Sequence, residues 1–97
     1  MTRALFRQTG GTLFLKVEGH SIKTTELDLC SAISILTENL ESSLTLLVKA
    51  NPRVQKSDGY FEIESIDEPA SNLLFASTLL GLRTLAKQYA TGLQVET

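Results

Sequence analysis

The chain contains a single histidine, His20, and a single cysteine, Cys30, ten positions further along. A cysteine thiolate is a strong nucleophile, and an imidazole within hydrogen-bond reach can accept the thiol proton and later donate it to a leaving amine. Together these two side chains have the chemistry needed to cleave a peptide bond. The two residues are therefore a candidate catalytic pair, with Cys30 as the nucleophile and His20 as the general base and then the general acid.

Other interpretations of the two residues stay open at this level. Cys30 lies three positions before Ile33 on an apolar stripe, where a cysteine often packs as a small hydrophobic residue. His20 could equally be a loop histidine without a catalytic role. The chain would then be a non-catalytic protein-binding module. A redox-sensing thiol protein is a weaker alternative, because the chain has no second cysteine to resolve a sulfenic acid.

The composition limits the other classes of function. The chain has 97 residues with 42% apolar and 21% charged, which predicts one globular domain over residues 1–97. Its net charge is -2 and its nine basic residues do not cluster, so we expect no nucleic-acid partner. One histidine and one cysteine are too few for a structural zinc site, so we expect no metal and no cofactor.

The sequence also indicates where the protein acts. No apolar run approaches the ~20 residues that a membrane-spanning helix needs, so we expect no membrane partner. The first residues do not predict a secretory signal. A lone cysteine cannot form an internal disulfide, which suits a reducing compartment. We therefore expect a cytoplasmic protein.

The first half of the chain predicts a hairpin and a helix. Residues 3–8 and 12–18 have the two-residue alternation of strands, and Thr9-Gly10-Gly11 between them is typical of a hairpin turn. From Leu27 to about Ala50, apolar residues recur every three or four positions, which indicates one face of a helix. Asn51-Pro52 is expected to end this helix.

The second half predicts the same order again. Residues 53–56 and 60–66 form a second hairpin around Ser57-Asp58-Gly59, with Phe61 and Ile63 facing the core and Tyr60 and Phe61 assigned to sheet packing. A helix follows Asp67-Glu68-Pro69 and is expected to continue to Gly92. Gly81 in this helix predicts the close approach of another backbone. The predicted fold is α+β, a two-layer ββαββα domain with an antiparallel four-stranded sheet and two helices.

These elements give each of the two reactive side chains a place in the predicted fold. Cys30 falls within about the first turn of the first helix, whose N-terminus stabilises an anion such as a thiolate. His20 lies in the loop from Gly19 to Thr25 that leads toward this helix. The backbone N–H groups of Cys30 and Ser31 are candidate oxyanion donors. Asp28 could support the pair or cap the helix, and Thr25 is an equally consistent cap with Asp28 as its partner.

The segments 17–21 and 27–34 resemble the ribosomal-processing cysteine protease family Prp, whose members have a strand that ends in Gly-His and a helix that starts around the cysteine. Gly19, His20, Cys30, Ala32 and Ser34 match this pattern position by position. The downstream segment 81–89 is similar to the last helix of the family. The aspartate of the family stands three residues before its cysteine, whereas Asp28 stands two before Cys30.

The resemblance implies an endopeptidase that removes a short N-terminal extension from a bacterial large-subunit ribosomal protein, cutting after an apolar stretch that contains an aromatic residue. Cys30 and His20 would be catalytic. The supporting residues would be Gly19, as a hinge of the mobile loop, together with Asp28, Ser31 and Ser34, the last of which lies one helical turn beyond Cys30. The expected partner is the N-terminal peptide of that ribosomal protein, and the resemblance implies a homodimer. The alternative is a non-catalytic ribosome-associated module of the same fold.

Overall fold

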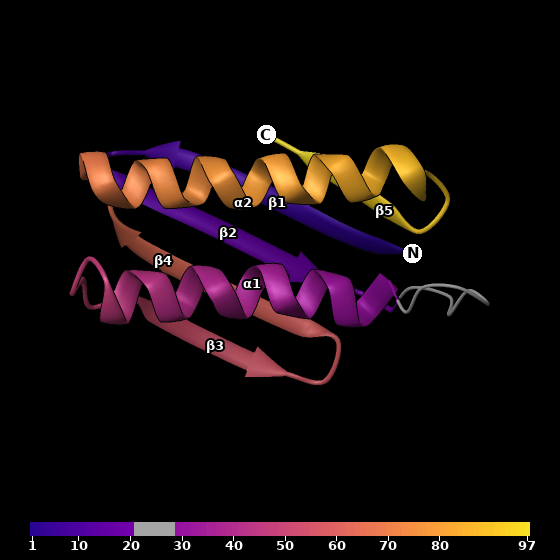
Figure 1. Ribbon diagram of the computed structural model, residues 1–97, viewed down its shortest axis with the longest axis horizontal. Coiled ribbons are helices and arrows are strands. Elements are labelled where there is room, and N and C mark those ends of the chain that lie inside the picture. The colour runs from indigo at the N-terminus through magenta and orange to yellow at the C-terminus, as the bar shows by residue number, and fades with distance from the viewer. Residues whose placement is uncertain (21–28) are drawn as a thin grey trace.

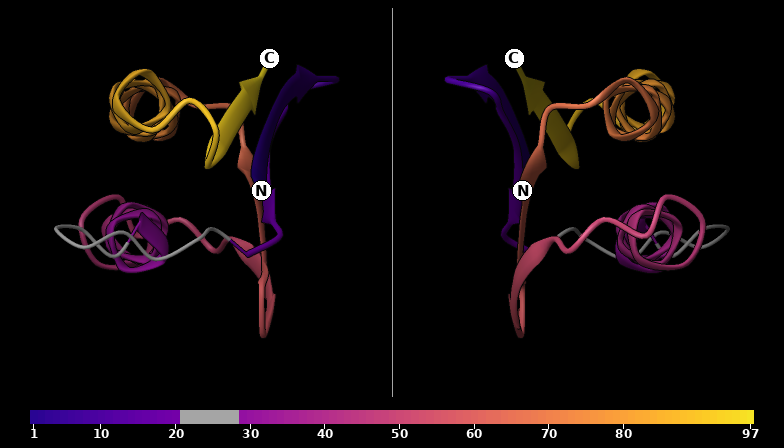
Figure 2. Two further views of the ribbon diagram at one scale, coloured as in Figure 1. Left: turned by 90° about the vertical axis from the view of Figure 1, so that its right-hand side faces the viewer. Right: turned by 90° about the vertical axis from the view of Figure 1, so that its left-hand side faces the viewer.

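The computed structural model describes residues 1–20 and 29–97. In this part of the chain the order of elements is β1 (Thr2–Thr9), β2 (Thr12–Glu18), α1 (Leu29–Leu46), β3 (Arg53–Ser57), β4 (Tyr60–Ile66), α2 (Pro69–Gln88) and β5 (Leu93–Glu96). Figure 1 shows the two helices side by side over the sheet. The end-on views in Figure 2 show that both helices cover the same face of the sheet. The predicted two-layer α+β class is confirmed.

Both predicted hairpins are present. Strands β1 and β2 pair from Arg3↔Glu18 to Thr9↔Thr12. Gly10 and Gly11 join them with φ of 59° and 79°, the left-handed backbone that a two-residue hairpin turn of this kind requires. Strands β3 and β4 pair antiparallel, and β4 also pairs antiparallel with β2. The start of β4 therefore lies beside the end of β2, where His20 follows.

The predicted four-stranded antiparallel sheet is wrong in one respect, because a fifth strand makes the sheet mixed. The strand order is β3-β4-β2-β1-β5, and β5 runs parallel to β1 from Thr2↔Leu93 to Leu5↔Glu96. Helix α2 ends at Gln88 with Tyr89 as its C-cap, short of the predicted end at Gly92. Leu93 falls in the three- and four-residue spacing of the apolar positions of α2, although it belongs to β5. Its burial beside β1, at 1% exposed, favours the strand.

Helix α1 also differs from its prediction. It ends at Leu46, before the predicted end near Ala50, and Lys49 adopts a left-handed φ of 58°. The amide of Val48 donates to the Ser43 carbonyl at 3.1 Å, which closes the last turn. Leu47 is 76% exposed, so its place in the apolar spacing does not reflect burial. The predicted start at Leu27 lies outside the described residues.

The core fills the space between the sheet and the helices. Leu13, Leu15 and Val17 on β2 and Phe61 and Ile63 on β4 are buried, as their alternation predicts. The two helices meet at Gly81, where a Cβ would lie 2.8 Å from Leu36 Cδ2. The neighbour that the glycine accommodates is therefore a side chain of α1, where a backbone was predicted.

Candidate active site

Gly19 turns the chain sharply as it leaves β2. Its φ of +109° is a conformation that residues with a side chain rarely adopt, and a Cβ here would collide with the Met1 carbonyl oxygen. The Gly19 amide donates to the Gly59 carbonyl at 2.9 Å, and the Met1 amino group donates to the His20 carbonyl at 3.1 Å. The backbone at Gly19 and His20 is thus tied to the turn between β3 and β4 and to the residue before β1.

His20 is an exposed residue whose imidazole packs on Gly59. A Cβ at Gly59 would lie 2.5 Å from His20 Nε2 and 2.8 Å from Cε1. The ring therefore occupies the space that a side chain at position 59 would take. Gly59 lies in the turn between β3 and β4 with φ of +71°.

Cys30 is the second residue of α1, within the first turn as the sequence predicts, and it is half-buried. The first residue of the helix, Leu29, is 1% exposed and anchors this end of the helix in the core. The backbone N–H groups in the first turn of any α-helix point away from the helix along its axis, so they favour a negative charge near them. Cys30 therefore lies in the helical turn that carries these groups.

His20 and Cys30 line the same pocket, which has a volume of about 280 Å³. Helix α1 contributes Cys30, Ile33, Ser34, Thr37 and Glu38 to its wall. The hairpin of β3 and β4 contributes Lys56, Ser57, Asp58, Gly59, Tyr60 and Phe61. The pocket therefore brings a thiol, an imidazole and apolar side chains to one concave surface, which are the kinds of group that a small hydrolase site uses.

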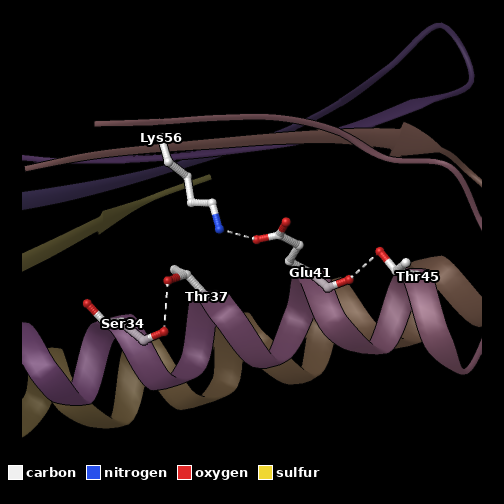
Figure 3. A network of polar contacts seen from close by, with 5 residues as sticks. All are labelled: Ser34, Thr37, Glu41, Thr45 and Lys56. Carbon is white, nitrogen blue, oxygen red and sulfur yellow. Dashed lines mark hydrogen bonds and ion pairs between the residues drawn. The ribbon is translucent and has the colours of Figure 1, made fainter. Parts of the chain in front are cut away.

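The structure brings together some of the predicted supporting residues. Gly19 and Ser34 line the pocket with His20 and Cys30. The Ser34 carbonyl accepts a hydrogen bond of 3.1 Å from Thr37 Oγ1 (Figure 3). Ser31 is exposed and does not line the pocket, so only its backbone could take part. Asp28 and Thr25 lie outside the described residues.

An ion pair lies beside the pocket and bridges α1 and β3. Lys56 Nζ on β3 lies 2.8 Å from Glu41 Oε1 on α1, and Figure 3 shows the two side chains pointing toward each other across the gap. The hydrogen bond to Glu41 and the charge of Glu41 raise the pKa of Lys56. Lys56 and Glu38 also line a second groove, of about 390 Å³, that continues along α1. The pair therefore marks the boundary between the pocket and this groove.

The wall that the β3–β4 hairpin provides was not predicted from the sequence. The alternation along β4 assigns Tyr60 and Phe61 to sheet packing, but both also line the pocket. The signal that could have found them is the topology of the sheet. Because β4 pairs antiparallel with β2, the start of β4 lies beside the end of β2, and therefore near His20. Tyr60 donates to Glu62 Oε1 at 2.6 Å, and this bond is the largest cause that raises the pKa of the Tyr60 phenol.

Over residues 1–20 and 29–97, no three histidine, cysteine, aspartate or glutamate side chains gather in a way that could hold a metal ion. Neither α1 nor α2 is both long enough and apolar enough to cross a membrane.

Comparison with known proteins identifies a family for the chain. The sequence model of the family described as Cysteine protease Prp matches residues 1–94. No curated protein sequence matches the chain.

Solved structures share the fold over almost the whole chain. The ribosomal processing protease Prp from S. aureus, in complex with a covalently linked product peptide, superposes with a TM-score of 0.86 at 19% identity, covering 99% of this chain and 98% of that one. The same protease with a substrate peptide gives 0.84 at 17% identity and covers both chains completely, at 100%. SMU.848 from Streptococcus mutans gives 0.78 at 25% identity, covering 99% of this chain and 96% of that one.

At such identities the S. aureus structures establish the fold, and the family model carries the assignment. Because that model spans residues 1–94 of 97, the resemblance seen in the sequence is confirmed: the chain belongs to the Prp family and is a cysteine protease.

Proposed function

We propose that this protease removes a short N-terminal extension from a bacterial large-subunit ribosomal protein, with Cys30 as nucleophile and His20 as general base and acid. The observation that carries the proposal is that His20 and Cys30, ten positions apart and on different elements, line one pocket. The S. aureus relative is a ribosomal processing protease whose crystal structure contains a substrate peptide. That relationship supports the same class of substrate for this chain.

The chemistry has two stages. His20 accepts the Cys30 thiol proton, and the thiolate attacks the scissile carbonyl carbon to form a tetrahedral oxyanion. The oxyanion collapses as the C–N bond breaks, and His20 donates its proton to the leaving amine. A water molecule, deprotonated by His20, then attacks the thioester and releases the acid product and the Cys30 thiol.

Supporting roles follow from position. The N–H groups of Cys30 and Ser31 at the start of α1 are proposed to stabilise the oxyanion, because the first turn of a helix directs its donors and its positive end toward such a charge. Ser34 is proposed to contact the thiol or the substrate from one helical turn away. Gly19 is proposed as the hinge of the loop that covers the peptide, and Asp28 as an aid to the pair.

The substrate segment is proposed to be apolar with an aromatic residue near the scissile bond. Ile33, Val17 and Phe61 provide apolar lining beside the two catalytic side chains. A cytoplasmic location is proposed because a lone reactive thiol suits a reducing compartment. A homodimer is proposed from the family resemblance.

The test is cleavage of a synthetic peptide that spans the extended N-terminus of such a ribosomal protein, with the products identified by mass spectrometry. Wild type is expected to cut one bond, and Cys30→Ala and His20→Ala are each expected to lose this activity. Ser77→Ala, a similarly small change at an exposed position on α2, is the matched control and should retain activity. An intact peptide with wild type, or cleavage that survives Cys30→Ala, would contradict the proposal.

A further inference from the structure

The contact between His20 and Gly59 joins two segments that are far apart in the sequence. A Cβ at Gly59 would lie 2.5 Å from His20 Nε2, 2.8 Å from Cε1 and 3.2 Å from Cδ2. These three atoms form one edge of the imidazole, so the ring rests with its Nε2 edge against the glycine. Any side chain at position 59 would have to displace this edge.

A backbone hydrogen bond holds the same two segments together independently of side chains. The Gly19 amide donates to the Gly59 carbonyl at 2.9 Å. A substitution at Gly59 retains this carbonyl, so the backbone beside His20 stays in place while the ring loses its seat. The contact of the ring with Gly59 can therefore be separated from the placement of the loop.

Gly59 has a second reason to be glycine, namely its φ of +71° in the turn between β3 and β4. The chain offers a matched comparison at Gly11, which has φ of +79° in the turn between β1 and β2. A Cβ at Gly11 would meet no atom within 4 Å among the described residues. Alanine at either position strains a backbone of similar φ, but only at Gly59 does it also reach the histidine.

We propose that Gly59 is a positioning residue for His20, because the absence of a side chain at position 59 creates the seat that orients the imidazole toward the pocket. The inference rests on the proposed function in that His20 is taken as the acid–base group. Gly59 acts only through His20. A misplaced base is expected to slow the chemical step while peptide binding is largely retained.

The first experiment compares Gly59→Ala with Gly11→Ala. The chain has one histidine, so its imidazole signals in an NMR spectrum need no assignment. Gly59→Ala is expected to shift these signals and to lower kcat about tenfold or more. Gly11→Ala is expected to leave both close to wild type, with a similar loss of thermal stability. KM is expected to stay within about twofold for both variants.

A pH profile separates positioning from a general loss of structure. The acid limb of kcat/KM, which follows the base, is expected to move in Gly59→Ala and to stay in Gly11→Ala. Should Gly59→Ala fail to fold, Gly59→Asn and Gly11→Asn repeat the comparison, since asparagine tolerates left-handed backbone and still carries a Cβ. Histidine signals and kcat that change equally at positions 59 and 11 would overturn the proposal.

The failure of the proposed function would look different. If wild type does not cleave the ribosomal-protein peptide, the NMR comparison and the pH dependence of Cys30 alkylation by iodoacetamide still report on the seat of His20. Histidine signals and an alkylation profile altered only in Gly59→Ala would then support the role of Gly59 while the substrate assignment falls.

Discussion

The side chain of Leu29 packs directly on Gly92, where a Cβ would lie 2.6 Å from Leu29 Cδ2. Leu29 is the first residue of α1 and precedes Cys30, while Gly92 precedes β5 and its carbonyl accepts a 2.9 Å bond from the Thr2 amide. The start of α1, where Cys30 lies, therefore packs on the turn that leads into β5. We expect this contact, which joins segments far apart in sequence, to help position Cys30.

Substitution Gly92→Ala tests this contact. The φ of Gly92 is outside the left-handed region, so its backbone accepts alanine, but the new Cβ must push Leu29 aside and shift the start of α1. We expect kcat on the ribosomal-protein peptide to fall several-fold. Thr91→Ala, at the exposed neighbouring position, should leave the rate unchanged. Equal rates for the two variants would show that the contact does not govern the position of Cys30.

The substitution Leu29→Ala tests the same contact by removing the leucine side chain. Leu29 is 1% exposed, so the loss of its buried atoms is expected to lower the free energy of unfolding by about 2–5 kcal/mol. Chemical denaturation measures this change. Ile35→Ala, at a position on the same helix that is 67% exposed, is the control and should have a much smaller effect. A small loss at Leu29 would mean that the start of α1 is not held by the core.

The contact between Gly81 and Leu36 predicts a coupled pair of substitutions. Gly81→Ala adds about 1 kcal/mol of helix propensity, but its Cβ would lie 2.8 Å from Leu36 Cδ2, so part of this gain is lost in moving the leucine. In a Leu36→Ala background the obstacle is absent and the gain of about 1 kcal/mol should appear in full. A double-mutant cycle of unfolding free energies measures the coupling. Additive effects would contradict it.

Asp67 predicts a dependence of stability on pH. Hydrogen bonds from Gln8 at 2.6 Å and Asn72 at 3.1 Å, in that order of effect, lower the pKa of its carboxyl below the ordinary value of 3.8. A lowered folded-state pKa stabilises the fold above the unfolded value, and this contribution disappears as pH falls through the folded value. Asp67→Ala should therefore melt below wild type at neutral pH.

The two melting temperatures should converge when the pH falls below the lowered folded-state pKa of Asp67. Glu68→Ala is the matched control, because the Glu68 side chain makes no capping hydrogen bond to the helix. The difference in melting temperature between Glu68→Ala and wild type should be the same whether or not Gln8 and Asn72 are substituted. A gap between Asp67→Ala and wild type that is constant from neutral to acid pH would contradict the assignment.

Lys56 predicts an effect on substrate choice with little effect on stability. The side chain is 51% exposed, and exposed ion pairs contribute little to folding. Lys56→Met leaves Glu38 and Asp58 in the pocket wall and frees Glu41 beside it. We expect a several-fold shift of kcat/KM toward peptides with lysine over matched peptides with glutamate near the scissile bond.

The control for this shift is Arg53→Met, which removes a cation from the same strand at a position outside the pocket. Its preference between the two peptides should match that of wild type. High salt should reduce the shift in Lys56→Met, because mobile ions screen exposed charges. If Lys56→Met and Arg53→Met show the same preference between the two peptides, Lys56 does not influence substrate choice.

Much of the fold could be predicted from local patterns. The alternation on β2, the glycines of the two hairpin turns and Asp67-Glu68-Pro69 before α2 each depend on neighbours in sequence, so their signals are readable in the chain itself. Strand β5 could not be predicted in this way. Leu93 and Val95 alternate over only four residues, and the choice of strand over helix depends on an edge of β1 that is remote in sequence.

The sequence by itself pointed to the proposed catalytic pair, because it contains one histidine and one cysteine and their surroundings resemble a family pattern. It also placed Cys30 in the first turn of a helix and His20 just after a strand. The tertiary structure alone decided what surrounds them: the seat at Gly59, the wall from the β3–β4 hairpin and the anchor of Leu29 on Gly92. The seat and the anchor join residues that are 39 and 63 positions apart, and local periodicity carries no information about which distant surfaces will pack together.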